Sequence, residues 1–104
     1  MIFDILTLFP NMFSGPFDQS IIKRAREKKL IEINYHDLRK FAVDERGSVD
    51  DRPYGGGVGM ILRIEPIFKA LKNIKRHSDL SRIVLLDPRG KKFTQKRRCH
   101  FNKY

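Results

Sequence analysis

The sequence has a single cysteine, Cys99, and no long hydrophobic run. One cysteine excludes an internal disulfide and is typical of a reducing compartment. The apolar stretch over residues 1–10 contains Asp4 and lacks both the basic residues of a signal peptide and the length of a membrane span. We therefore expect a cytoplasmic protein with no membrane partner.

Metal-ligand spacing, internal repeats and heptad patterns are also missing. His36, His77 and the adjacent Cys99 and His100 do not have the spacing of a metal site, so structural or solvated roles are expected for them and no metal cofactor is expected. The length of 104 residues, with 40% hydrophobic and 33% charged side chains, indicates one soluble globular domain. Such a chain buries roughly two-thirds of its unfolded surface.

Acidic residues are missing from one end of the chain. Six of the 22 basic residues lie in residues 91–104, which hold no acid, so the first ninety residues hold 16 basic and 12 acidic residues, a net charge of +4. The total of +10 favours a nucleic-acid partner. A second basic cluster lies on a predicted helix, where a solvated face is favoured over a phosphate contact: Lys23, Arg24, Arg26, Lys28 and Lys29.

The first part of the chain predicts a β-α-β unit. The apolar run over residues 2–9, ended by Pro10, predicts a buried parallel strand. A narrow apolar stripe among charges predicts an amphipathic helix over residues 18–29, and alternation predicts a half-buried strand over residues 30–36.

Further elements continue the alternation of strands and helices. Apolar residues at helical spacing from Ile64 to about Arg76, with Pro66 in the first turn, predict a second helix. The β-branched run over residues 83–86 predicts a third strand, which ends at the turn sequence of residues 87–90. This order indicates an α/β protein with a parallel sheet, in which ligands bind at the carboxyl ends of the strands.

Residues 38–60 lack periodicity and end in the glycine-rich run DDRPYGGGVGM, residues 50–60. Glycines permit positive φ and close approach to a ligand. The run is neither a P-loop, which needs lysine and a hydroxyl residue after the last glycine, nor a dinucleotide fingerprint, which needs a third glycine. A binding loop is favoured over a linker, because flexible linkers lack the charged and aromatic prefix.

Four stretches in this order resemble the bacterial tRNA (guanine-N1)-methyltransferases, enzymes of the SPOUT class that methylate guanosine 37 beside the anticodon. They are LFPNMF at residues 8–13, VDDRPYGGGVGM at residues 49–60, Glu65-Pro66, and LDPRG at residues 86–90. DDRPYGGG is the most specific of them. The similarity covers residues 1–96, an N-terminal part of the methyltransferase domain and well under half of a typical family member. Residues 97–104 remain as an aperiodic basic tail, of the kind that truncation or a frameshift leaves.

The resemblance implies a homodimer that binds tRNA and holds S-adenosylmethionine in a trefoil knot. It also implies that the later cofactor loops, the aspartate that serves as general base on guanine N1 and a C-terminal tRNA-binding domain follow the residues of this chain. The expected fold is therefore the N-terminal part of a SPOUT-type parallel sheet with an incomplete knot. No catalytic residue is expected within the chain, and the chain alone is expected to be inactive.

The resemblance also assigns site residues. It implies tRNA contacts for the glycine loop and its prefix: Asp50, Asp51, Arg52, Tyr54, Gly55, Gly56, Gly57 and Gly59. An aspartate suits the N1–H and N2–H donors of a splayed guanine. It implies cofactor contacts after the third strand: Leu85, Leu86, Asp87 and Pro88.

Plainer roles compete with these assignments. Asp50 could cap a turn and pair with Arg52, residues 85–88 could simply end a strand, and Tyr54 is expected to pack on the loop slightly more than to stack on a base. Two functions compete with the enzyme: a non-catalytic tRNA-binding fragment, and a truncated gene product without function.

Overall fold

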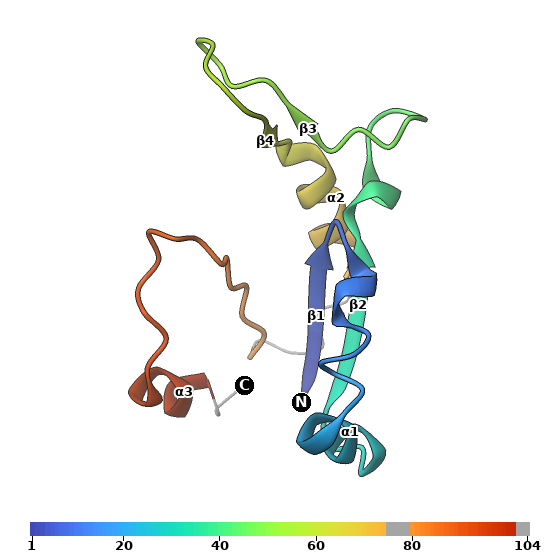
Figure 1. Cartoon of the computed structure of the whole chain (residues 1–104), viewed down its shortest axis with the longest axis vertical. Helices are drawn as coiled ribbons and strands as arrows, with labels where there is room; N and C mark the ends of the chain where they lie inside the picture. The colour runs from blue at the N-terminus through green and yellow to red at the C-terminus, as the bar shows by residue number, and fades with distance from the viewer. Residues whose placement is uncertain (75–79, 102–104) are drawn as a thin grey trace. The chain divides into compact units, whose positions relative to one another are not determined.

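The computed structural model describes residues 1–74 and 80–101, and the chain divides into two units at Ile74. In the first unit, strand β1 (Ile2–Thr7) and strand β2 (Glu32–Asp37) pair in parallel, from Ile2 opposite Glu32 to Thr7 opposite Asp37. Helix α1 (Ser20–Glu27) connects them, so the predicted β-α-β unit is confirmed. Figure 1 shows β1 and β2 side by side, with α1 near the start of β2.

Helix α1 ends in a left-handed residue. Lys29 has a φ of 55°, and the N–H of Leu30 donates to the carbonyl of Ala25 at 2.9 Å. This is the hydrogen-bonding pattern of a Schellman motif, which satisfies a free carbonyl of the last turn and reverses the chain into the next element. The motif explains why β2 begins only a few residues after α1.

The first strand ends in a polar turn followed by a short helix. The hydroxyl of Thr7 accepts a hydrogen bond from the N–H of Phe9 at 3.1 Å, and the 3₁₀ helix η1 (Pro10–Phe13) follows. Phe13 stacks on Tyr35 of β2 and lies against Phe17, with ring centroids 5.5 Å apart in both pairs. These aromatic contacts cover part of the two-stranded sheet.

A small core lies beyond the carboxyl ends of the two strands. It joins the 3₁₀ helix η2 (Leu38–Phe41) to helix α2 (Ile64–Asn73). Its buried members are Leu38, Val49 and Ala70, with Leu6, Leu8, Phe41, Ala42 and Ile67 packed against them, and Pro66 of α2 is fully buried as well. Helix α2 confirms the second predicted helix; the expected end near Arg76, and His77, lie outside the described residues.

The second unit contradicts one prediction. Residues 81–87 form no strand, and the side chains of the apolar run are largely exposed, with Leu85 at 83% and Leu86 at 91%. A strand needs a neighbour for its N–H and C=O groups, and no segment of the described chain pairs with this run. Apolar, β-branched sequence alone therefore did not make a strand.

The basic end of the chain is partly helical, although its sequence has no clear period. Helix α3 (Gln95–Phe101) includes the first residues of the expected tail, and residues 102–104 lie outside the described part. The described elements form a mixed α/β structure with a parallel sheet, which confirms the coarse fold class. Among the described residues, no helix is both long and apolar enough to cross a membrane.

Candidate functional site

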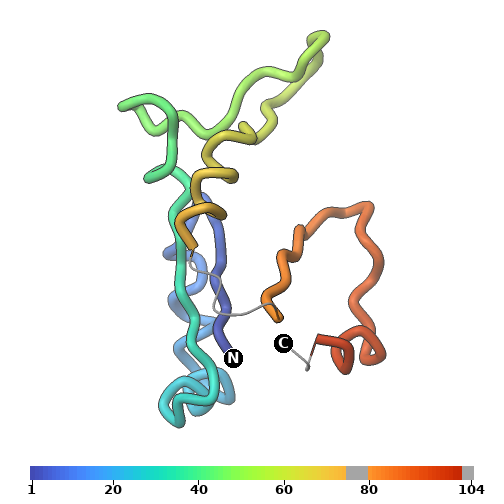
Figure 2. The backbone as a smooth tube through the Cα atoms, turned by 180° about the vertical axis from the view of Figure 1, so that it is seen from behind, coloured from blue at the N-terminus to red at the C-terminus, as the bar shows by residue number. Residues whose placement is uncertain are grey.

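The glycine-rich run forms the tip of a hairpin. Strand β3 (Asp50–Asp51) pairs antiparallel with strand β4 (Ile61–Leu62), so that Asp50 lies opposite Leu62 and Asp51 opposite Ile61. In Figure 2 the chain between them runs out and back as one narrow hairpin. Sequence reasoning located this loop but missed the strand pairing, because each strand has only two residues and no detectable alternation.

The glycines of the tip adopt positive φ, one of the two uses that the sequence indicated for them. Gly55, Gly56, Gly57 and Gly59 have φ values of 84°, 83°, 125° and 99°. A Cβ added at any of the four would have no heavy atom within 4 Å. The glycines are therefore required by positive φ and not by packing within this chain, which leaves their backbone open to an incoming ligand.

Asp51 is held at the base of the hairpin. One carboxylate oxygen accepts a hydrogen bond from the N–H of Arg52 at 2.8 Å, and the other lies 3.6 Å from the guanidinium of Arg63. Arg63 also donates its backbone N–H to the carbonyl of Val49 at 2.8 Å, which extends the pairing of β3 and β4. The sequence did not predict a role for Arg63 in this site, because nothing in its spacing indicated that it lies across the hairpin from Asp51.

Asp50 and Arg52 do not pair with each other. Within the described chain, neither side chain makes an ion pair, and Asp50 is exposed. Neighbouring residues of a strand point to opposite faces, so Asp51 shares a face with the buried Val49 and Asp50 points the other way. The alternative of an Asp50–Arg52 structural pair was therefore wrong, and both side chains are available to a partner.

A second carboxylate, that of Asp44, stabilises the turn that precedes β3. Asp44 accepts a hydrogen bond from the backbone N–H of Ser48 at 2.8 Å. Hydrogen bonds from the Ser48 side chain and backbone lower the pKa of Asp44 below its usual 3.8, against an opposing effect of desolvation, and the charge of Arg63 lowers the pKa by a smaller amount. The charged form of Asp44 therefore closes the turn that leads into the hairpin.

Tyr54 is fully exposed, at 100%, and so is Val58 of the same loop. The expectation that Tyr54 packs against the loop was wrong, because a two-stranded hairpin offers no surface behind its tip. An exposed aromatic ring next to open glycine backbone is suited to stacking on a base.

The residues expected to contact the cofactor lead into a tight turn between Asp87 and Gly90. Asp87 accepts hydrogen bonds from the backbone N–H of Arg89 at 2.8 Å and from its Nε at 3.3 Å. These bonds, the backbone one first, lower the pKa of Asp87 against a slight opposing effect of burial. Gly90 donates its N–H to the Asp87 carbonyl at 2.8 Å, and a Cβ on Gly90 would lie 2.9 Å from that oxygen.

S-adenosylmethionine needs a pocket that encloses its adenosine. Leu85 and Leu86 are exposed apolar side chains, and Pro88 is exposed as well. In this structure these residues form an apolar edge without enclosing walls. The cofactor therefore does not fit a site made by residues 85–88 alone, because an edge removes only one side of the adenosine from water.

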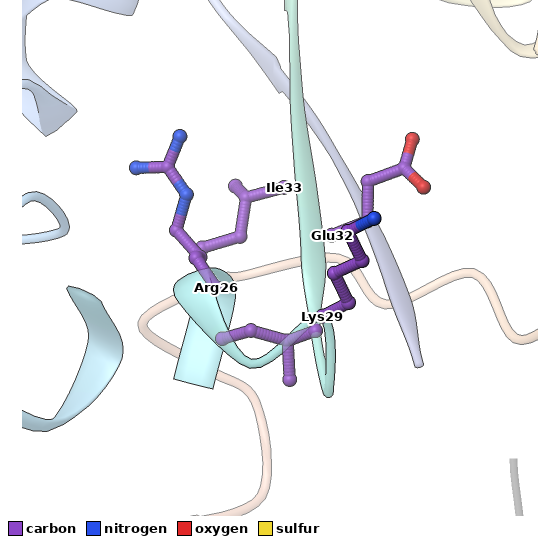
Figure 3. Close-up of a pocket in the computed structure, with 5 residues that line it drawn as sticks. Arg26, Lys29, Glu32 and Ile33 are labelled. Carbon is purple, nitrogen blue, oxygen red and sulfur yellow. The ribbon is translucent and has the colours of Figure 1, made fainter. Parts of the chain in front are cut away.

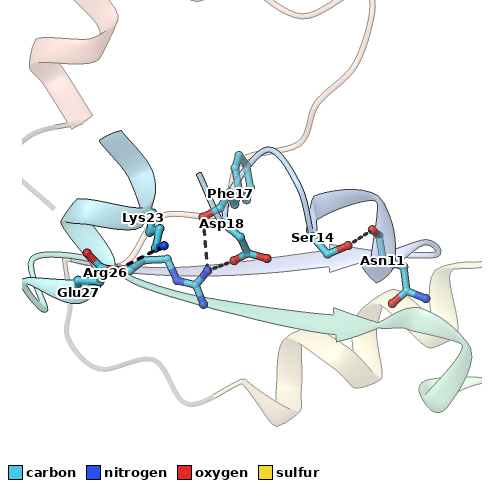
Figure 4. A network of polar contacts seen from close by, with 7 residues as sticks. All are labelled: Asn11, Ser14, Phe17, Asp18, Lys23, Arg26 and Glu27. Atoms are coloured by element: carbon cyan, nitrogen blue, oxygen red, sulfur yellow. Dashed lines mark hydrogen bonds and ion pairs between the residues drawn. The ribbon is translucent and has the colours of Figure 1, made fainter. Parts of the chain in front are cut away.

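A shallow cavity of about 330 Å³ lies elsewhere, between the end of α1 and the start of β2 (Figure 3). It is lined by Arg26, Lys29, Ile31, Glu32 and Ile33. Arg26 is engaged by the carboxylate of Asp18 and, at 3.4 Å, by the carbonyl of Phe17 (Figure 4). Because both charge signs line the cavity and its arginine is already paired, it is not a strong ligand site.

Metal binding is not indicated by the described residues, where no group of three or more histidine, cysteine, aspartate or glutamate side chains could hold an ion. Asp4 and His36, from β1 and β2, form a half-buried pair with 2.9 Å between Oδ1 and Nε2. This pair links the two strands and agrees with the structural role expected for His36.

Two known proteins that are similar to this chain carry the same description. The chain is 52% identical over 93 residues to the tRNA (guanine-N(1)-)-methyltransferase of Dictyoglomus turgidum, and the match covers 89% of this chain and 37% of that protein. The enzyme of the same description from Enterococcus faecalis is 50% identical over 95 residues, with 89% and 39% covered.

A solved structure and a family model extend the comparison. The tRNA (m1G37) methyltransferase of Aquifex aeolicus matches with a TM-score of 0.64 and 43% identity, over 69% of this chain and 32% of that one. The chain thus spans little more than a third of the length of its curated relatives. A family model described as tRNA (Guanine-1)-methyltransferase TrmD matches residues 1–104. The chain belongs to the tRNA (guanine-N1)-methyltransferase family.

Proposed function

We propose that this chain is the part of a tRNA (guanine-N1)-methyltransferase that contacts the substrate guanosine through its glycine hairpin. The complete enzyme would transfer methyl from S-adenosylmethionine to N1 of guanosine 37. The observation that carries the proposal is the hairpin itself, which presents exposed Asp50, Arg52 and Tyr54 beside open, positive-φ glycines in a chain of this family.

Asp50 would read the Watson–Crick edge of guanine. That edge offers the N1–H and N2–H donors, and an ionised carboxylate accepts both. The Asp50 carboxylate is exposed and makes no hydrogen bond within the described chain, so binding a base costs it no internal partner. Guanine must leave its stack to be read in this way, and Tyr54 supplies a ring on which a base could stack.

Asp51 and Arg52 would have supporting roles. Asp51 holds the N–H of Arg52 and the guanidinium of Arg63, so it contributes mainly by shaping the base of the loop. Arg52 carries an exposed guanidinium that suits a phosphate oxygen of the tRNA. The backbone of Gly55, Gly56, Gly57 and Gly59 would lie close to the bound nucleotide, since no side chain separates them.

Methyl transfer would need more than this chain. Guanine N1 must lose its proton as the methyl group arrives, so a general base is required near N1, and the hairpin carboxylates are proposed to bind and not to act as that base. Leu85, Leu86, Asp87 and Pro88 would supply one side of the cofactor site. We propose that the remaining walls, the closed trefoil knot and a homodimer belong to the complete enzyme, that it works in the cytoplasm, and that the chain alone is inactive.

A chimera tests this function. The part of the Dictyoglomus turgidum enzyme that aligns with this chain is replaced by the matching 93 residues of this chain, and methyl transfer from S-adenosylmethionine to an unmodified tRNA transcript is measured. We expect activity in the chimera and none in the 104-residue chain alone. Asp50→Ala should lower kcat/KM about 10- to 100-fold, which corresponds to the loss of a hydrogen bond to a charged group.

Two controls make the result specific. A transcript with adenosine in place of guanosine 37 should not be methylated, and Glu45→Ala, which removes an exposed carboxylate outside the hairpin, should leave kcat/KM unchanged. Full activity of the Asp50→Ala and Arg52→Ala chimeras would overturn the assigned contacts. A folded chimera that does not methylate tRNA would overturn the function itself.

A further inference from the structure

A strongly cationic surface lies outside the hairpin, on residues 91–101, which we call the basic segment. It holds five basic residues and no acidic one: Lys91, Lys92, Lys96, Arg97 and Arg98. Each of its residues except Phe101 is exposed, and α3 carries three of the cations. The positive charge is therefore concentrated on an accessible surface.

These five cations differ from several of those in residues 1–74. In that unit Lys23 lies 3.9 Å from Glu27, Arg26 pairs with Asp18, and Arg63 lies 3.6 Å from Asp51. No cation of the basic segment makes an ion pair within the described chain. Within residues 80–101 the sole carboxylate is Asp87, which is already bonded to Arg89. Residues 80–101 thus offer the basic segment no free carboxylate as a counter-charge.

Aromatic contacts give the basic segment a shape. The rings of Phe93 and Phe101 lie with centroids 6.1 Å apart, and His100 contacts Phe101 edge-on at 6.1 Å. The first contact ties the end of α3 back to the residues just after Lys91 and Lys92. The cations before the helix and those on it are therefore held in one compact unit.

We propose that the basic segment binds the phosphate backbone of RNA, as a contact surface separate from the glycine hairpin. Closely spaced, unpaired lysines and arginines bind a polyphosphate chain because they release its condensed counter-ions. An anionic membrane would require a broad apolar face as well, and α3 has only Cys99 and Phe101 as apolar members among its seven residues. This inference rests on the proposed tRNA substrate.

The salt dependence of tRNA binding by the 104-residue chain tests the proposal. Binding of a labelled tRNA transcript is measured by fluorescence anisotropy from about 50 to about 200 mM KCl, and the slope of log K against log salt is determined. We expect the triple variant Lys96→Gln, Arg97→Gln, Arg98→Gln to reduce that slope by about 2 to 3, since each lost phosphate contact removes about 0.7 to 0.9.

A matched variant shows whether tRNA binding depends on the basic segment itself or only on the net charge of the chain. Lys23→Gln, Arg24→Gln, Lys28→Gln removes an equal number of positive charges from α1 and its C-cap and should reduce the slope by less than 1. Equal effects of the two variants would overturn the proposal, as would binding of the wild-type chain to phosphatidylserine vesicles with no binding to tRNA. Circular dichroism establishes that both variants are folded. Absence of tRNA binding would overturn this inference, while activity of the chimera would still support the proposed function.

Discussion

Two apolar runs of this chain have opposite fates. Residues 2–6 form part of β1 because β2 lies alongside in parallel register, whereas residues 83–86 remain exposed and unpaired within the described chain. The units around them differ as well. Residues 1–74 hold 12 basic and 10 acidic residues, and residues 80–101 hold seven and one.

The difference shows that the two units differ in how many of their apolar and charged groups find a contact within the unit itself. Residues 1–74 supply their own strand partner, a small core and counter-ions for several cations. Residues 80–101 leave both apolar and cationic groups exposed. Exposed Leu85 and Leu86 are consistent with a proposed cofactor edge, and the exposed cations with a proposed RNA contact. The first unit thus satisfies more of its own groups than the second does, although a tRNA contact is proposed on each.

Truncating one leucine in each unit should give the largest difference in the free energy of unfolding between the two units. Leu38 is 5% exposed in the core, so Leu38→Ala should reduce the free energy of unfolding by about 2 to 4 kcal/mol. Leu86 is 91% exposed, so Leu86→Ala should change it by less than about 0.5 kcal/mol. Urea unfolding followed by circular dichroism measures both. A comparable loss in the two variants would mean that residues 80–101 share the core of the first unit.

Two glycines of the first unit sharpen the comparison at the level of the backbone. Gly56 has a φ of 83°, so Gly56→Ala should cost about 1 to 2 kcal/mol of unfolding free energy in the first unit. Gly15 has no positive φ and open space around it, and Gly15→Ala should cost nothing. The two variants are compared by urea unfolding, and equal costs would contradict strain as the cause.

Substitution of Gly90 should change only the conformation of its own turn. Its Cβ would meet the Asp87 carbonyl at 2.9 Å, so Gly90→Ala should open the turn at Asp87 without moving the urea midpoint of the first unit. Amide chemical shifts of Asp87, Arg89 and residue 90 measure the turn directly. Unchanged shifts would show that the turn tolerates the added methyl group.

The smallest expected effect is a pH dependence. The pKa of Asp44 is lower when folded than its usual 3.8, so its contribution to stability is present above that value and is lost as the pH falls through the folded pKa. Asp44→Asn should flatten the decline of the urea midpoint between about pH 5 and about pH 3.

Asp87 provides the matched case. Its pKa is lowered as well, by the N–H and side chain of Arg89, but both partners belong to the second unit. Asp87→Asn should therefore leave the pH dependence of the first unit's urea midpoint unchanged. An equal flattening by both variants would show that the two units unfold together.

Sequence reasoning predicted the β-α-β unit, the helix at Pro66 and the positive φ of the loop glycines, because each depends on neighbours close along the chain. It failed for residues 83–86, where composition favoured a strand and no partner was available. It also missed Arg63 and the β3–β4 pairing, which depend on contacts across the hairpin. Contacts between residues that are distant along the chain produce no periodic pattern in the sequence from which they could be predicted.

By itself, the sequence determined the family, the location of the glycine loop and the imbalance of charge, since these are properties of residue type and order. The tertiary structure decided how the loop is presented: Asp51 is held by Arg63, while Asp50 and Tyr54 are exposed. The physical reason is that strand pairing sets the face on which each side chain points, and pairing is a property of two segments at once.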